Sequence, residues 1–87
     1  MMMDRQDILA ALKQLIEPYT SSKEMLDSVN EQTDLLKDLH INSSSLIDII
    51  IDAEEKYKIE FDPESIEKMV TVGSTIDIIL EKLKEQA

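Results

Sequence analysis

The stretch LHINSSSLIDIIIDAEEKY, residues 39–57, places three consecutive serines directly ahead of a strongly apolar pattern. From residue 43 to about residue 57 or 58, apolar side chains recur at the spacing of one helix face. The stretch therefore predicts an amphipathic helix whose first turn is made of serines. On a helical wheel its core-facing stripe consists of Leu46, Ile49, Ile50, Ala53 and Tyr57.

Two isoleucines, Ile47 and Ile51, fall outside this stripe and share a helix face with Asp48, Glu54 and Glu55. Some apolar surface is normal on any protein, so the pair alone does not define a site. An apolar centre within an acidic rim nevertheless favours a partner that is apolar at its centre and basic at its rim. We therefore predict a protein-binding face on this helix.

One further helix is predicted before this one and two are predicted after it. The first spans about residues 4–17 and stops at Pro18. A short one spans about residues 63–69, where Asp62 can cap, and the last spans about residues 72–85, with Thr71 as its cap. The apolar stripes of the first and last helices are Ile8, Leu12, Leu15, Ile16 and Tyr19, and Val72, Ile76, Ile79, Leu80 and Leu83.

A long polar connection, residues 19–42, joins the first two main helices and carries scattered apolar residues that we expect to pack back onto the core. Loops of this length are uncommon in compact domains and are often functional. With one glycine and three aromatic residues among 87, turn and strand signals are few. The sequence thus predicts one all-α domain over residues 1–87: a small bundle of three main helices plus one short helix, with a long first loop.

Composition narrows the possible functions. The chain is too small for a deep active-site cleft, and without cysteine it has no thiolate nucleophile and no thiolate metal site. A net charge of −10 disfavours nucleic acid and favours a basic protein partner. No apolar run is long enough to span a membrane, and the start MMMDRQ does not resemble a secretory signal. We expect a cytoplasmic protein.

The sequence does not favour a hydrolase triad, a calcium loop or a zinc site. His40 and Ser43 lie close in sequence near acids, but a hydrolase triad also needs an oxyanion hole and a substrate pocket. A calcium loop needs a central glycine among alternating oxygen ligands, and Gly73 is the only glycine. One histidine without cysteine makes a tight zinc site improbable. The sequence therefore favours a binding role over catalysis.

The serine run Ser43, Ser44, Ser45 has two interpretations. Asn42 or Ser43 can cap the helix without any further chemistry. Alternatively, a serine at a helix N-terminus is well placed to carry a phosphate ester, because the unpaired backbone N–H groups and the positive end of the helix dipole favour negative charge. The residues alone leave both interpretations open.

In this arrangement the chain resembles the acyl carrier protein family. The stretch TDLLKDLHINSSSLIDIIIDAEEKYKIEF, residues 33–61, is similar to the family's DLG-x-D-S-L-x-x-V-E segment and its EEEF ending. The stretch TVGSTIDIILEKL, residues 71–83, is similar to the opening of its final helix. The order of the helices extends the resemblance over nearly the whole chain.

Counting back from the family's EEEF ending places Ser43 at the modified position, with Ser44 as the fallback if this register is wrong by one. The resemblance then implies that a phosphopantetheinyl transferase attaches 4′-phosphopantetheine from coenzyme A to Ser43. The arm would hold an acyl group as a thioester, which would give a cysteine-free protein thiol chemistry. The cargo could also retreat between the helices of an Ile- and Leu-rich bundle.

The resemblance implies a carrier and not an enzyme, with no catalytic residues and no metal. The implied partners are the transferase and acyl-loading ligases or synthases with basic docking patches, in fatty acid biosynthesis or related lipid metabolism. We expect a monomer that exchanges partners rapidly.

Three residues beside the attachment position depart from the family pattern. His40 replaces Gly, Asn42 replaces Asp, and Ser44 replaces Leu. These departures favour a specialised carrier over the general fatty acid carrier. They also leave two alternatives: an unmodified helical protein-interaction module, and a peptidyl or aryl variant of the carrier.

Overall fold

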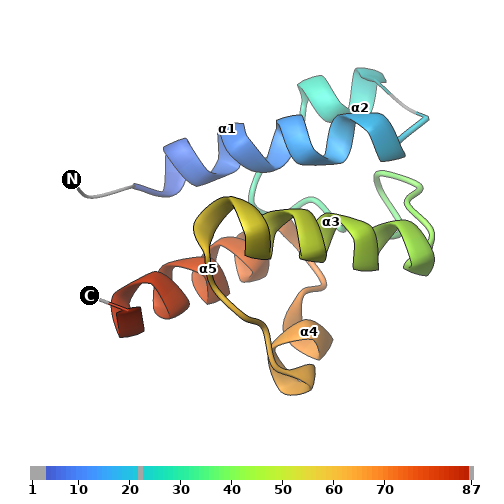
Figure 1. The fold of residues 1–87 in the computed structure, drawn as a ribbon. Helices are drawn as coiled ribbons and strands as arrows, with labels where there is room; N and C mark the ends of the chain where they lie inside the picture. The colour runs from blue at the N-terminus through green and yellow to red at the C-terminus, as the bar shows by residue number, and fades with distance from the viewer. Residues whose placement is uncertain (1–3, 22, 87) are drawn as a thin grey trace.

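The computed structural model describes residues 4–21 and 23–86, and this part of the chain is helical (Figure 1). The three long helices are α1 (Arg5–Ile16), α3 (Ser43–Tyr57) and α5 (Val72–Gln86). Two short helices, α2 (Lys23–Asp27) and α4 (Pro63–Lys68), and a 3₁₀ turn, η1 (Glu17–Tyr19), complete the described elements. The described residues contain no strand, only one isolated antiparallel bridge between Asp34 and Thr71. The predicted all-α bundle is confirmed.

Helix α1 begins with a reciprocal cap. The Asp4 carboxylate accepts from the Asp7 amide at 2.9 Å, and the Asp7 carboxylate accepts from the Asp4 amide at 3.4 Å. At the other end α1 stops at Ile16, ahead of Pro18 as predicted, and the chain continues into the 3₁₀ turn η1, which was not predicted. A proline is accommodated in that first turn, where its missing N–H costs no hydrogen bond.

The predicted caps of α3 and α5 are both present. The Asn42 side chain accepts from the Ser45 amide at 2.8 Å. Thr71 Oγ1 accepts from the Ser74 amide at 3.1 Å, and Ser74 Oγ in turn accepts from the Thr71 amide at 3.1 Å. Side-chain oxygens of this kind satisfy amides that have no partner within the helix.

The prediction that Asp62 caps α4 is only partly confirmed. Asp62 occupies the N-cap position, with Pro63 in the first turn, but its side chain makes no capping hydrogen bond. One Asp62 carboxylate oxygen instead lies 3.8 Å from Lys82 Nζ of α5. The helix ends at Lys68, one residue before the predicted end.

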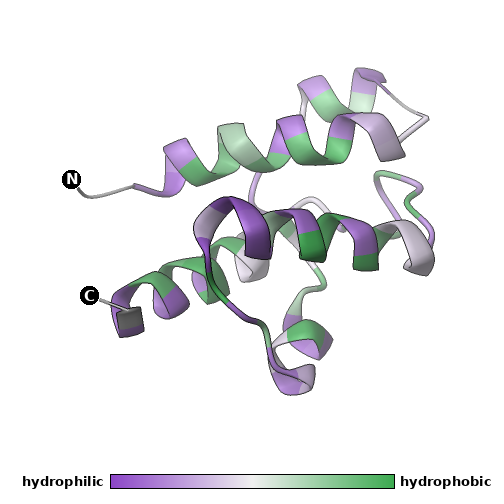
Figure 2. Cartoon of the chain, viewed as in Figure 1, coloured by the Kyte–Doolittle hydropathy of each residue, from purple (hydrophilic) through white to green (hydrophobic). Residues whose placement is uncertain are grey.

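The three long helices turn their apolar faces toward one another, as the green segments in Figure 2 show. The predicted stripes supply much of this core, and Leu15, Tyr19, Leu46, Leu80 and Leu83 are partly buried at its edge. Three buried residues lie in or beside the connection between α3 and α5 and were not predicted from any stripe: Ile59, Phe61 and Met69. The stripe residues that are buried are Ile8, Leu12, Ile16, Ile49, Ile50, Ala53, Tyr57, Val72, Ile76 and Ile79.

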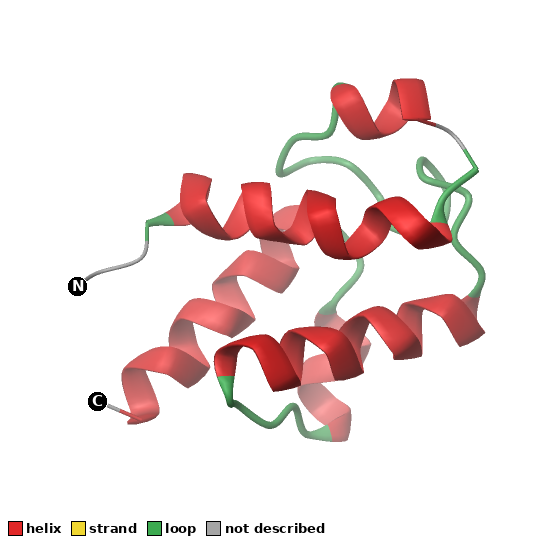
Figure 3. Cartoon of the chain, turned by 45° about the horizontal axis from the view of Figure 1, so that its top comes forward, coloured by secondary structure: helices red, strands yellow, loops and turns green. Residues whose placement is uncertain are grey.

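The long connection between α1 and α3 is more ordered than the sequence predicted. It contains α2, which is too short for apolar periodicity to reveal it, and residues 28–42 run as loop across the bundle (Figure 3). Two of its apolar residues, Met25 and Leu36, are exposed. The others are buried, as expected: Leu26, Val29, Leu35, Leu39 and Ile41.

Backbone hydrogen bonds fasten this connection to the start of α5. The Leu35 amide donates to the Val70 carbonyl at 3.0 Å, and the Val72 amide donates to the Thr33 carbonyl at 2.9 Å. The Gly73 amide donates to the Glu31 carbonyl at 2.8 Å. We call these three bonds the connection seam. Because they pair backbone groups at the core edge, they compensate for the missing secondary structure.

Arg5 joins three segments beside the connection seam. Its Nε donates to both carboxylate oxygens of Glu31 at 3.1 Å, and one terminal nitrogen donates to Asp77 Oδ1 at 2.5 Å. The Arg5 hydrogen bonds lower the pKa of the Glu31 carboxyl. The groups are partly exposed, so solvent screens their attraction, and the main effect is to orient α1, the connection and α5.

We predict that Gly73→Ala destabilises the protein by about 1–3 kcal/mol, because the new methyl group would force the backbones apart. A Cβ at position 73 would lie 2.8 Å from the Glu31 carbonyl oxygen and 3.1 Å from the Glu31 Cβ. Urea unfolding measures the change.

An exposed residue of the same helix provides the control: Glu81→Ala should change stability by less than about 0.5 kcal/mol. Alanine normally favours a helix over glycine by about 1 kcal/mol. A Gly73→Ala protein as stable as the wild type, or more stable, would contradict the prediction.

Candidate functional site

The serine run lies at the exposed N-terminus of α3. Ser43 is the first residue of the helix, Ser43 and Ser44 are both exposed, and Ser45 is half-buried. The Asn42 side chain accepts a hydrogen bond from the Ser45 amide, and the Asn42 carbonyl accepts one of 3.0 Å from the Leu46 amide. The amides of the two exposed serines therefore remain at the positive end of the helix dipole.

The first turn of α3 carries no acidic residue, although the chain as a whole has a net charge of −10. The nearest acid along the helix is Asp48, more than one turn after Ser43. A negatively charged ester at Ser43 or Ser44 would thus meet a positive helix end without a like charge in the same turn. The arrangement suits a phosphate ester.

The turn that leads into α3 is held from both sides. Leu39 and Ile41 are buried, and the buried Thr20 hydroxyl donates to the Leu39 carbonyl at 2.7 Å. Between them His40 is exposed and has a φ of 54°, in the left-handed region. Histidine tolerates this region better than most residues but not without strain. The position has the backbone geometry that favours glycine.

The residues of the predicted protein-binding face, called the partner face below, lie together on α3. Ile47 is 45% exposed and Ile51 is 46% exposed, one and two turns after the serines. Asp48 and Glu55 are exposed beside them, and Glu54 is half-buried. The structure therefore brings together the five side chains that the sequence assigned to this face.

Glu54 also has a structural contact that the sequence did not reveal. Its Oε2 accepts a hydrogen bond of 2.8 Å from the Phe61 amide. This bond fixes the segment that leaves the C-terminus of α3. Glu54 thus belongs both to the acidic rim and to the support of the next connection.

Asp52 is a second acid whose contact was missed. It is half-buried, and one carboxylate oxygen accepts from the Tyr19 hydroxyl at 3.3 Å, which links α3 to the end of η1. Burial raises the pKa of the Tyr19 hydroxyl, and the negative charge of Asp52 raises it further. Asp52 therefore helps to orient the helices.

An open groove of about 450 Å³ continues the partner face beyond the end of α3. Glu60 extends the acidic rim there, and the largely buried Ile59 and Phe61 also line the groove. A helical wheel could not find these residues, because they follow the helix. The groove is lined by Ile51, Glu54, Glu55, Ile59, Glu60 and Phe61.

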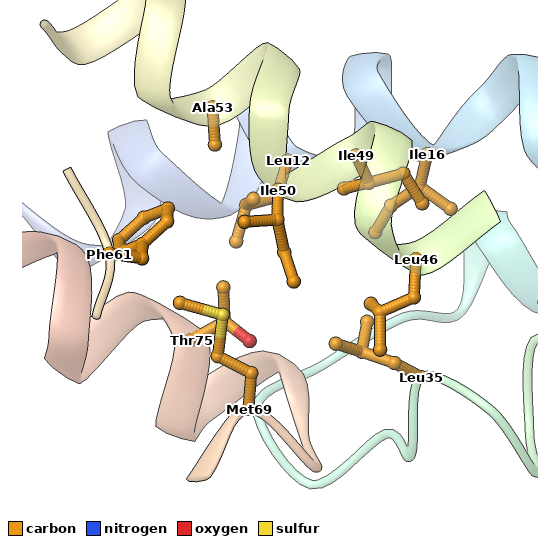
Figure 4. Close-up of a pocket in the computed structure, with 10 residues that line it drawn as sticks. All are labelled: Leu12, Ile16, Leu35, Leu46, Ile49, Ile50, Ala53, Phe61, Met69 and Thr75. Carbon is orange, nitrogen blue, oxygen red and sulfur yellow. The ribbon is translucent and has the colours of Figure 1, made fainter. Parts of the chain in front are cut away.

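A small apolar cavity lies inside the bundle, under α3 (Figure 4). Its volume is about 10 Å³, close to the smallest space that holds one water molecule. Thr75 is the single polar side chain in its lining, and the Thr75 hydroxyl donates to the Thr71 carbonyl at 3.0 Å. The cavity is lined by Leu12, Ile16, Leu35, Leu46, Ile49, Ile50, Ala53, Phe61, Met69 and Thr75.

Residues 4–21 and 23–86 contain no group of three or more His, Asp or Glu side chains placed to hold a metal ion. None of the helices described above is long and apolar enough to cross a membrane.

Known proteins resemble this chain over nearly its whole length. No family model matches it. An acyl carrier protein of Tropheryma whipplei is 32% identical over 82 residues, which are 92% of this chain and 95% of that protein. The crystal structure of an acyl carrier protein from Thermotoga maritima gives a TM-score of 0.82 at 26% identity and covers 98% of this chain and 96% of that one. An acyl carrier protein structure from Enterococcus faecalis gives a TM-score of 0.74 at 26% identity, with 92% and 99% covered.

We predict that His40→Gly stabilises the protein by about 0.5–1 kcal/mol, because glycine occupies the left-handed region without the clash that histidine suffers. The gain is reduced by the greater freedom of glycine in the unfolded chain. Thermal or urea unfolding measures it. Lys37→Gly, an exposed position of the same connection without a positive φ, should destabilise instead. Equal effects of the two substitutions would show that the backbone at residue 40 is unstrained.

Proposed function

Because the chain belongs to the acyl carrier protein family, we propose that it carries acyl groups on a 4′-phosphopantetheine arm attached to Ser43. The observation that supports this most directly is the position of Ser43, exposed and first in α3. The arm, when attached, supplies the thiol that a chain without cysteine lacks and holds the cargo as a thioester. The protein is then a carrier between enzymes and not itself a catalyst.

The residues around Ser43 fit this group. The N-terminal amides of α3 and the helix dipole favour the negative charge of the phosphodiester. Asn42 directs its side chain to the Ser45 amide, and so the cap is satisfied without using the Ser43 hydroxyl. Ser44 is exposed beside it and is the alternative attachment residue.

The partner face supplies recognition. Ile47 and Ile51 form the apolar centre, and Asp48, Glu54 and Glu55 form an acidic rim that steers basic partners toward it. The partners are the phosphopantetheinyl transferase and acyl-loading ligases or synthases. Two half-exposed isoleucines make a small contact, which suits brief encounters better than a permanent complex.

The departures at the attachment position favour a dedicated pathway. Ser44 replaces the apolar residue that normally follows the modified serine, and its exposed hydroxyl offers a partner no apolar contact. A loading ligase or synthase adapted to this surface is expected, in a specialised branch of fatty acid, polyketide or related metabolism.

The interior cavity is the shelter that we propose for the cargo. Its lining is apolar, which suits the aliphatic part of an acyl chain. At about 10 Å³ it has no room for an acyl chain at rest, so cargo must push the lining side chains apart to enter. The burial of apolar carbon offsets that cost.

We predict that incubation with a broad-specificity phosphopantetheinyl transferase and coenzyme A adds one arm to the wild type, and that Ser43→Ala abolishes the addition. Intact-mass measurement detects it. Ser44→Ala is the matched control and should be modified like the wild type. Loss of the mass shift in Ser44→Ala alone would move the attachment by one residue.

Absence of any addition, under conditions that modify an ordinary carrier, would favour the second candidate function. This is an unmodified helical module that binds a protein through the same exposed isoleucines. The observation that favours it is that the partner face of α3 is complete without an arm.

We predict that Ile47→Asp or Ile51→Asp lowers kcat/KM for modification by the transferase about tenfold, because an added charge replaces apolar contact at the centre of the partner face. Met25→Asp is the matched control, since Met25 is 37% exposed but lies on α2. Circular dichroism verifies that each variant folds. Equal rates for the wild type and the α3 variants would show that the transferase docks elsewhere.

A further inference from the structure

Phe61 lines two separate spaces in the structure. It belongs to the apolar cavity inside the bundle and also to the open groove beyond the end of α3. Its side chain is 8% exposed, and it is the residue that the two linings share. Phe61 therefore lies between the interior cavity and the surface groove.

The residues that line the cavity are spread along α3. Figure 4 shows Leu46 and Leu35 at one end and Phe61 at the other, with α3 running along the length between them. Leu46 lies three residues after Ser43, almost one helical turn, so this end faces the proposed attachment. A chain that enters beside Leu46 and follows α3 meets Phe61 last.

Phe61 is held in place by its backbone. The Phe61 amide donates to Glu54 Oε2 at 2.8 Å, which ties the connection after α3 to the last turns of that helix. The neighbouring Ile59 is 3% exposed and anchors the same segment in the core. Leu46 and Ala53 are seven residues apart, so the helix length that covers the cavity is about 10 Å.

We propose that Phe61 is a specificity-determining residue that limits the length of acyl chain that the bundle shelters. This inference rests on the carrier function proposed above. Carbons that fit between Leu46 and Phe61 are buried, and further carbons meet the aromatic ring. Without the ring, the cavity would open into the groove of about 450 Å³, where the exposed Ile51 offers further apolar surface.

The test uses the holo protein loaded on Ser43 with saturated acyl groups that lengthen stepwise, each verified by intact mass. Urea unfolding gives the folding equilibrium constant of every form relative to the protein with the bare arm. In the wild type this constant should rise, by up to about fourfold for each buried methylene, and then level off. In Phe61→Ala it should level off at a longer chain.

Two further variants separate the role of Phe61 from general stability. Ile59→Ala removes a buried side chain from the same connection, and this side chain belongs to a residue that lines the groove but not the cavity. The acyl chain length at which its folding constant levels off, called the levelling length, should therefore equal that of the wild type. Phe61→Leu keeps an apolar side chain in the core and should level off between the wild type and Phe61→Ala. It keeps the test valid if the alanine variant does not fold.

Amide chemical shifts provide an independent readout. In the wild type, lengthening the cargo should leave the Glu60 amide in the groove unchanged. In Phe61→Ala, acyl chains longer than the wild-type limit should change the chemical shift of the Glu60 amide.

Equal levelling lengths in the wild type and both Phe61 variants, with loading verified by mass, would overturn the role of Phe61 and leave the carrier function intact. A constant that never changes with chain length would also overturn it, since the cargo would then lie outside the bundle. A protein that accepts no arm would overturn the carrier function itself, and the mass measurement distinguishes that result.

Discussion

The connection seam, in which residues 31–35 meet residues 70–73, holds a long, mostly irregular segment against the start of α5. Three backbone hydrogen bonds make this contact, and Gly73 permits it because a side chain there would collide with the Glu31 backbone. Once this segment is fixed, Leu39 and Ile41 reach the core and the turn before Ser43 takes one position. The position of the exposed serines is therefore expected to depend on a contact with the start of α5, more than twenty residues later in sequence.

Helix patterns made much of this fold predictable from the sequence. The apolar stripes of α1, α3 and α5 repeat at helical spacing, and the predicted caps of α3 and α5, Asn42 and Thr71, follow from local chemistry. The exposure of Ile47 and Ile51 followed from the same wheel. What the wheel captures is periodic and local.

The features that were missed are neither periodic nor local. Helix α2 has five residues, and the buried Ile59 and Phe61 lie in a connection where no stripe is defined. The bond between Glu54 and the Phe61 amide joins a charged side chain to a backbone group seven residues later. The position of Phe61 between the interior cavity and the surface groove depends on how α3 and the connection after it fold over the core. Patterns within a single helix do not encode this arrangement.

The double use of Glu54 affects how this surface can evolve. Its carboxylate belongs to the acidic rim of the proposed partner face and also supports the backbone after α3, so a substitution there is expected to change recognition and architecture together. Glu55 is exposed beside it, and we expect a substitution there to affect recognition more than architecture. Adaptation to a new enzyme is thus expected to pass through position 55 more freely than through position 54.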